Sequence, residues 1–269
     1  MKTILVPTDF SANADKALDF ALDIAPKMGA KLHIFNAFDL PYSQNVMTTS
    51  LLDALRESSE AGLKELSKRI EGRGVVFVTE SKLGNPISVS RELVKREKVD
   101  LLILGTRGAS GIEEVLIGSN AAAILHAVDC PVLAIPAHST PDSIQDIAFA
   151  TDGNTKGETL ALPRLKMLAE VFGARIHILH VFDPESTELS VINEAHYRKQ
   201  LDGVDLHFAL VEKNQSVEKS LLEYAENNNV DVLALLARRY GFLQSLFHNS
   251  LTSRIAYHSR LPFLTLHED

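Results

Sequence analysis

The sequence is poor in cysteine, in long apolar runs and in clustered positive charge. Its single cysteine, Cys130, excludes an internal disulfide. No stretch approaches the roughly 18 uninterrupted apolar residues of a membrane-spanning helix, and the apolar run after Met1 and Lys2 is too short for a signal peptide. The formal net charge is -8, and the chain has neither a Lys/Arg stripe nor alternating aromatic and basic residues. We therefore expect a soluble cytoplasmic protein that binds neither membranes nor nucleic acids.

The sequence also lacks the common signatures of catalytic and metal sites. Its glycines form neither a Walker A motif nor G-x-G-x-x-G, and no G-x-S-x-G elbow is present. The ten histidines include no H-x3-H pair in the context of a zinc helix. Cys130 precedes Pro131 without a recognisable base, so we expect a buried and inert thiol. We assign no catalytic residue and no metal site.

The chain is a tandem duplication. Three segments of the first half return in the second half in the same order: Thr8-Asp9 as Thr151-Asp152, residues 30–39 as 174–183, and residues 99–131 as 230–262 without a gap. A polar, proline-containing linker lies at residues 137–142. We predict one domain at residues 1–138 and another at 144–269, each large enough to bury its own core.

Short β-branched runs alternate with helical patterns in the first half. The expected strands lie near residues 3–6, 31–35, 75–79, 101–104 and 132–135. The first helix places six apolar residues on one face, with Ser11 as its N-cap: Ala14, Ala17, Leu18, Ala21, Leu22 and Ala25. A longer helix is expected over residues 48–70. This βαβ pattern predicts a doubly wound parallel sheet, with its switch point between the first and fourth strands.

A glycine-rich loop follows the predicted fourth strand. Gly105-Thr106-Arg107-Gly108 comes directly after that strand, and Gly118-Ser119-Asn120 opens the next helical run. Glycines let backbone N–H groups approach a phosphate, and a helix N-terminus favours an anion. Alternatively, the glycines only make turns and Ser119 only caps the helix.

The spacing G-x2-G-x9-G-S resembles that of the universal stress protein family. Two other segments of the first half agree with the resemblance: Val6-Pro7-Thr8-Asp9-Phe10-Ser11 and Asp129-Cys130-Pro131-Val132. The duplication makes this a tandem two-domain form. The resemblance implies two flavodoxin-like, Rossmann-like α/β domains with five-stranded parallel sheets in the order 3-2-1-4-5. It also implies ATP as the ligand, with or without Mg²⁺.

By position, the resemblance carries the family's nucleotide contacts onto ten residues. Adenosine contacts fall on Pro7, Thr8, Asp9 and Ala37, and phosphate contacts fall on Gly105, Arg107, Gly108, Gly118, Ser119 and Asn120. Three of these have other interpretations. Asp9 could cap the first helix, Arg107 could be a solvated loop charge, and Ser119 could bind phosphate, ligate magnesium or only cap.

The second copy has lost the glycines. Its ungapped alignment places Leu236, Arg239 and Asn249 opposite Gly105, Gly108 and Gly118. Side chains there would occupy the space of a phosphate and disfavour positive φ. Ser250 and Asp152 survive, and Arg238-Arg239 could attract another anion or be solvated. We expect a degenerate second domain and one competent site per chain, in the first domain.

Three function classes follow from this pattern. The first, which we favour, is a stress-response regulatory protein that binds ATP. The second is a nucleotide-independent scaffold that acts through dimerisation or partner binding, and the third is a slow ATPase. We expect no other enzymatic activity. The apolar strands at residues 132–135 and 263–266 should lie at sheet edges, where they could pair within the chain or across a homodimer.

Overall fold

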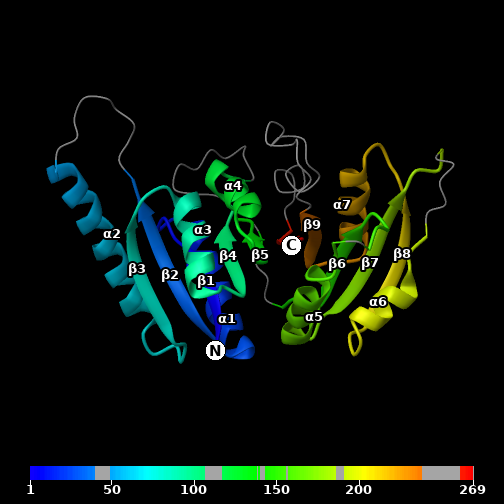
Figure 1. Cartoon of the computed structure of the whole chain (residues 1–269), viewed down its shortest axis with the longest axis horizontal. Helices are drawn as coiled ribbons and strands as arrows, with labels where there is room; N and C mark the ends of the chain where they lie inside the picture. Colours follow the sequence, from blue (N-terminus) through cyan, green and yellow to red (C-terminus); the bar gives the residue numbers. More distant parts are fainter. Residues whose placement is uncertain are drawn as a thin grey trace. The chain divides into compact units, whose positions relative to one another are not determined.

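A computed structural model of the chain describes residues 1–39, 49–106, 117–137, 139, 143–155, 157–185, 191–237 and 261–268. The chain divides into two compact units, Met1–Ala137 and His138–Asp269 (Figure 1). Each unit is an α/β structure whose five strands pair in parallel with one another. Five predicted positions in the two glycine loops, Arg107, Gly108, Arg239, Asn249 and Ser250, lie outside the described residues, as does Arg238.

The first unit alternates strands and helices from its first residues to its last strand. Its elements are β1 (Lys2–Pro7), α1 (Ala12–Met28), β2 (Ala30–Phe38), α2 (Thr49–Ile70), β3 (Phe77–Leu83), α3 (Pro86–Glu97), β4 (Leu101–Gly105), α4 (Ser119–Ala127) and β5 (Val132–Ile135). All of its strand pairs are parallel, and they give the order β3-β2-β1-β4-β5. The buried core is built from the side chains of β1, β2, β4 and β5 together with the buried faces of the helices, above all α1.

Helix α1 follows its sequence pattern closely. Ser11 is the N-cap, since its Oγ accepts a hydrogen bond from the Ala14 N–H at 3.2 Å. All six apolar residues predicted to share one face are buried. Gly29 ends the helix with a φ of 61°, the left-handed conformation that glycine adopts without steric penalty. The prediction for this helix is confirmed.

The third strand begins later than its apolar residues indicated. We expected it over residues 75–79, whereas β3 spans Phe77–Leu83. Gly74 has a φ of 73° and belongs to the turn that leads into the strand, which delays regular pairing until Phe77 meets Leu32. Polar residues then continue β3, because it stays paired with β2 up to Phe38, the last residue of β2. Of the valines in the run, Val75 and Val76 precede the strand and Val78 lies on it, and Val76 and Val78 are exposed.

The helices of the first unit cover both faces of its sheet. Helices α1 and α2 are joined by two hydrogen bonds from the Arg69 guanidinium to the Asp15 carboxylate, at 2.7 and 2.8 Å. Helix α3 packs beside α4. Right-handed crossovers in this strand order place the first pair of helices on one face and the second pair on the other. The carboxyl ends of β1 and β4, from which the chain departs in opposite directions, therefore flank the switch point.

The second unit repeats this plan. Its elements are β6 (Asp146–Thr151), α5 (Ala161–Phe172), β7 (Arg175–Phe182), α6 (Glu194–Gln200), β8 (Leu206–Glu212), α7 (Val217–Asn227), β9 (Val232–Ala237) and β10 (Phe263–His267). Parallel pairing gives the order β10-β9-β6-β7-β8. The predicted fold class is confirmed in both halves. Among the described residues, no helix is long and apolar enough to cross a membrane.

Candidate functional site

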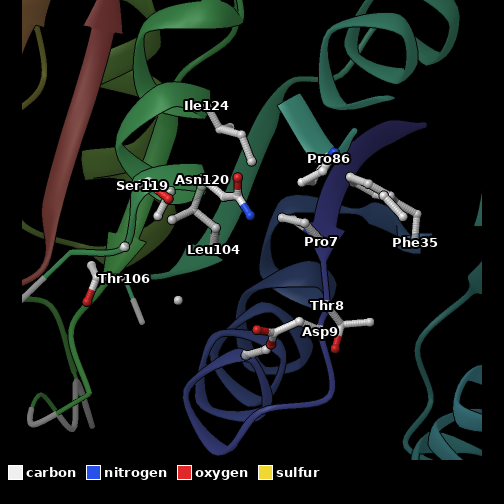
Figure 2. Close-up of a pocket in the computed structure, with 15 residues that line it drawn as sticks. Pro7, Thr8, Asp9, Phe35, Pro86, Leu104, Thr106, Ser119, Asn120 and Ile124 are labelled. Carbon is white, nitrogen blue, oxygen red and sulfur yellow. The ribbon is translucent and has the colours of Figure 1, made fainter. Parts of the chain in front are cut away.

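A cavity of about 280 Å³ lies at the carboxyl ends of β1 and β4 in the first unit. Figure 2 shows Thr8 and Asp9 on one side of it and Thr106, Ser119 and Asn120 on the other. Its volume is near the lower end of the roughly 300–1,000 Å³ typical of small-molecule sites. Eight of the ten residues predicted to form the site line this cavity: Pro7, Thr8, Asp9, Ala37, Gly105, Gly118, Ser119 and Asn120.

A tight turn after β1 holds Thr8 and Asp9. The Thr8 Oγ1 accepts a hydrogen bond from the Phe10 N–H at 3.0 Å, and Asp9 Oδ1 accepts one from the Ser11 N–H at 3.1 Å. The buried Asn36 amide of β2 donates to the Thr8 carbonyl at 2.7 Å, which ties the turn to the neighbouring strand. Because Ser11 is the N-cap of α1, the alternative in which Asp9 caps that helix is wrong. Asp9 is exposed at the cavity.

Gly105 is required by packing inside the protein. A Cβ at this position would lie 2.7 Å from the Asn13 carbonyl oxygen and 2.8 Å from its carbon, distances that side-chain carbons essentially never show. The Asn13 amide in turn donates to the Ile135 carbonyl at 3.0 Å. The first turn of α1 therefore lies against the end of β4. Sequence analysis missed Asn13, whose short polar side chain in the first turn of a helix was the available signal.

The N-terminus of α4 opens onto the cavity without a side-chain cap. Gly118 occupies the N-cap position and makes no side-chain cap hydrogen bond, while its own N–H donates to the Thr106 carbonyl at 2.6 Å. Ser119 is the first residue of the helix, so the alternative in which it only caps α4 is wrong. The first N–H groups of a helix have no intrahelical partner, and together with the helix dipole they favour a negative charge.

Thr106 is a cavity residue that sequence analysis did not single out, although it lies inside the glycine run. Its side chain is 1% exposed, and its Oγ1 has no hydrogen-bond partner among the described residues. A buried hydroxyl without a partner is unfavourable by about 1–3 kcal/mol. Thr106 is also one of the residues that line the cavity.

The remaining wall of the cavity is apolar. Phe35 comes from within β2, Leu104 from near the end of β4, and Ile124 from α4. Pro86 is held at the start of α3, whose N-cap Asn85 accepts a hydrogen bond from the Ile87 N–H at 2.9 Å. Figure 2 shows these side chains and Pro7 around the same cavity. The cavity thus combines an apolar part with the polar ends of β1, β4 and α4. No group of three or more His, Cys, Asp or Glu side chains in the described ranges could hold a metal ion.

The second unit builds the same turn after its first strand. The Gly153 N–H donates to Thr151 Oγ1 at 3.0 Å and the Asn154 N–H donates to Asp152 Oδ1 at 3.0 Å, as Phe10 and Ser11 do in the first unit. His180, the repeat counterpart of Asn36, contacts the Thr151 carbonyl through Nδ1 at 3.1 Å. The duplication therefore preserves the local geometry at this strand end.

The environment of that turn differs between the units. In the second unit the Thr151 hydroxyl donates to Glu158 Oε1 at 3.0 Å, and the Tyr197 hydroxyl lies 2.9 Å from Thr151 Oγ1 and 3.1 Å from Glu158 Oε1. Glu158 is 1% exposed and Tyr197 is 0% exposed. Burial raises the pKa of the Glu158 carboxyl, and burial also raises the pKa of the Tyr197 hydroxyl. These three side chains, Thr151, Glu158 and Tyr197, form a buried polar cluster that sequence analysis did not predict.

The late start of helix α5 explains why the second unit accommodates a leucine, Leu236, at the position that corresponds to Gly105. In the repeat, Ala161 corresponds to Ala17, so α5 lacks the first turn by which α1 reaches β4. Leu236 lies in β9 at the position of Gly105, where its side chain is half-buried. Loss of this glycine therefore accompanies a shorter helix.

Comparison with known proteins agrees with the duplicated fold. The universal stress protein family model matches residues 1–136 and again residues 143–267. A universal stress protein of Methanocaldococcus jannaschii is 31% identical over 138 residues, which cover 50% of this chain and 81% of that protein. One from Synechocystis is 22% identical over 98% of this chain and 99% of its own length.

A solved structure shows the same fold over the whole length. It is the crystal structure of a universal stress protein from Archaeoglobus fulgidus, with a TM-score of 0.79 and 22% identity over 99% of this chain and 96% of that one. The family matches in both halves account for most of the sequence. This chain belongs to the universal stress protein family.

Proposed function

We propose that this chain is a regulatory protein of the stress response that binds one ATP, in its first unit. The observation that carries the proposal is the uncapped N-terminus of α4 beside the buried, unpartnered hydroxyl of Thr106. Both groups lie on one cavity, and both are suited to an anionic oxygen. The phosphates would be held there, together with Ser119 and Asn120. We propose the same role for Arg107 and Gly108, and Mg²⁺ would enter with the triphosphate.

The rest of the cavity suits a nucleoside. A flat apolar base fits beside Phe35, Pro86 and Ile124, because such surfaces dominate small-molecule sites. The Asp9 carboxylate can accept hydrogen bonds from hydroxyl or amino groups of the nucleoside. Family membership supports the proposal that the ligand is an adenine nucleotide.

The contacts in the second unit support the proposal that each chain has one nucleotide site. There, Glu158 and Tyr197 bond the hydroxyl that corresponds to the cavity-lining Thr8. A buried carboxyl group at that point disfavours a polyanion when it is ionised and leaves less room when it is not. We propose that nucleotide occupancy of the first unit acts as the signal, and that a homodimer transmits it.

The test is calorimetric titration of the purified, nucleotide-free protein with ATP and magnesium. We expect about one ATP per chain. Thr106→Val removes the hydroxyl without changing the shape of the side chain, and we expect it to weaken ATP binding about tenfold, the value of a hydrogen bond to a charged group.

Thr265→Val is the matched control. Thr265 lies in β10 of the second unit, is 0% exposed, and also has a buried Oγ1 without a partner among the described residues. Both substitutions should therefore leave stability unchanged or slightly higher, but only the first should affect binding. Equal effects of the two valines, or no binding by the unchanged protein, would reject the proposed site and leave the scaffold function.

A further inference from the structure

Phe10 adopts a backbone conformation that its side chain disfavours. Its φ is 61°, in the left-handed region, which is unusual for a bulky aromatic residue. The second unit has Gly153 at the same place in the same turn, with a φ of 79°. The hydrogen bonds of the turn are matched in the two units, so the turn itself needs only a residue that tolerates positive φ. The first unit uses phenylalanine where glycine would be relaxed, so the ring must provide something else.

The Phe10 ring packs directly on Gly62, in the interior of α2. A Cβ at Gly62 would lie 2.5 Å from the Phe10 Cζ and 2.8 Å from both Cε atoms. Glycine inside a helix is itself unfavourable by roughly 0.5–1 kcal/mol relative to alanine. One contact, which joins the turn after β1 to α2, therefore explains both the positive φ of Phe10 and the presence of Gly62 inside a helix. Such exceptions to local preference concentrate at functional sites.

The contact lies next to the site without being part of it. Phe10 is 39% exposed and does not line the cavity, whereas Thr8 and Asp9 directly before it do. Thr8 is tied to Phe10 through its Oγ1, and Asp9 is tied to the following residue, Ser11. A shift of the ring on α2 must therefore move the two residues that border the nucleoside part of the cavity.

We infer that Phe10 is a positioning residue, which sets Thr8 and Asp9 for the nucleoside by resting its ring on Gly62, so that α2 controls nucleoside affinity. This inference rests on the proposed nucleotide site of the first unit. It assigns α2 a role in binding although α2 contributes no lining residue among those described. The phosphate end, built from α4 and the end of β4, does not depend on this contact.

The test measures affinities for ATP, adenosine and inorganic tripolyphosphate in three variants. Phe10→Gly keeps the turn, relieves the left-handed strain and removes the ring. We expect the affinities for ATP and adenosine to fall about fivefold or more, the lower end of typical coupling between sites, while tripolyphosphate binding stays unchanged. Gly62→Ala displaces the ring from α2 while every residue of the turn stays the same, and it should have the same selective effect. Phe10→Leu keeps a smaller apolar side chain, so it should bind ATP and adenosine more tightly than Phe10→Gly but less tightly than the unchanged protein.

The double variant Phe10→Gly/Gly62→Ala separates the contact from general damage. If the ring on Gly62 is the cause, the second substitution should add nothing to the first. Unchanged adenosine affinity in Phe10→Gly, or an equal loss for adenosine and tripolyphosphate in both single variants, would overturn the inference while the ATP site stands. No ATP binding by the unchanged protein would instead reject the proposed function, and this role with it.

Discussion

In the first unit the Thr8 hydroxyl borders a cavity, whereas in the second unit the matching hydroxyl of Thr151 is bonded by Glu158 and Tyr197. The turns around the two threonines have the same hydrogen bonds. The difference therefore comes from the elements packed around the turn. Ala14 of α1 lines the first cavity, and counting back from the matched helix ends Gly29 and Gly173 places Glu158 opposite it in the repeat.

This comparison shows how two duplicated units can keep the same fold and differ at one strand end. Strand order, parallel pairing and the turn after the first strand persist in both units. The changes are a later helix start in α5, a leucine in place of Gly105, and buried polar side chains that hydrogen-bond to one another. The second unit thus has a buried polar cluster where the first unit has a cavity.

The largest effect is expected from moving the carboxylate into the first unit. Ala14→Glu places a carboxyl group in the cavity wall, where it repels a polyanion in a poorly solvated environment. We predict a loss of ATP affinity of about 100-fold or more, which corresponds to about 2.7 kcal/mol, measured by titration calorimetry. Ala14→Gln has nearly the same size without the charge and should lose much less. Equal losses in the two variants would show that volume, and not charge, separates the units.

Gly105→Ala tests the close approach of α1 to β4. The new Cβ would meet the Asn13 backbone at 2.7 Å, and backbone cannot move aside as a flexible side chain can. We predict that the free energy of unfolding of the first unit falls by about 1–3 kcal/mol, the usual cost of overpacking. Urea denaturation followed by hydrogen exchange of β1 and β4 amides measures it. An unchanged unfolding midpoint would contradict the packing explanation for this glycine.

Tyr197→Phe removes one hydroxyl from the buried cluster of the second unit. Glu158 then keeps its hydrogen bond from Thr151 but loses a neighbour, so we predict a decrease of about 1 kcal/mol in the unfolding free energy of that unit. ATP affinity of the first unit should not change. Hydrogen exchange of β6 and β7 amides reports the stability change, and calorimetry reports the binding. A parallel loss of ATP affinity would place the cluster in the nucleotide site.

Glu158→Gln should have the smallest effect, visible as a change in pH dependence. Burial raises the pKa of the Glu158 carboxyl above its ordinary value of 4.5, against hydrogen bonds from Thr151 and Tyr197 that lower it. The folded unit therefore holds this proton more tightly than the unfolded chain. The resulting stability is fully present below pH 4.5 and is lost as the pH rises through the raised pKa.

Glutamine does not titrate, so the variant should not show that loss. In thermal unfolding between pH 4 and 8, the stability of the variant relative to the parent should increase as the pH rises. Two other ionisable groups lie beside Glu158: His196, with Nε2 at 3.7 Å from Glu158 Oε2, and Asp152. His196→Gln in the same background controls for the histidine. Parallel pH profiles of parent and Glu158→Gln would contradict the burial argument.

Local features of the sequence predicted the fold and one side of the site well. The α1 face and its Ser11 cap follow from spacing within one helix, and Asp9 and Ser119 line the cavity as their motif positions indicated. Contacts between distant segments were not predictable in this way. The approach of Asn13 to Gly105 depends on how α1 lies on the sheet. The cluster of Glu158 and Tyr197 depends on where α5 starts and on the packing of α6, and neither residue carries a motif.

Amide hydrogen exchange of the whole chain with and without ATP tests the central claim, a single nucleotide site in the first unit, most directly. The account predicts slower exchange at residues 8–11 and at the first turn of α4, with no change at residues 151–154. Protection of the turn in the second unit, or no protection at the first turn of α4, would contradict it.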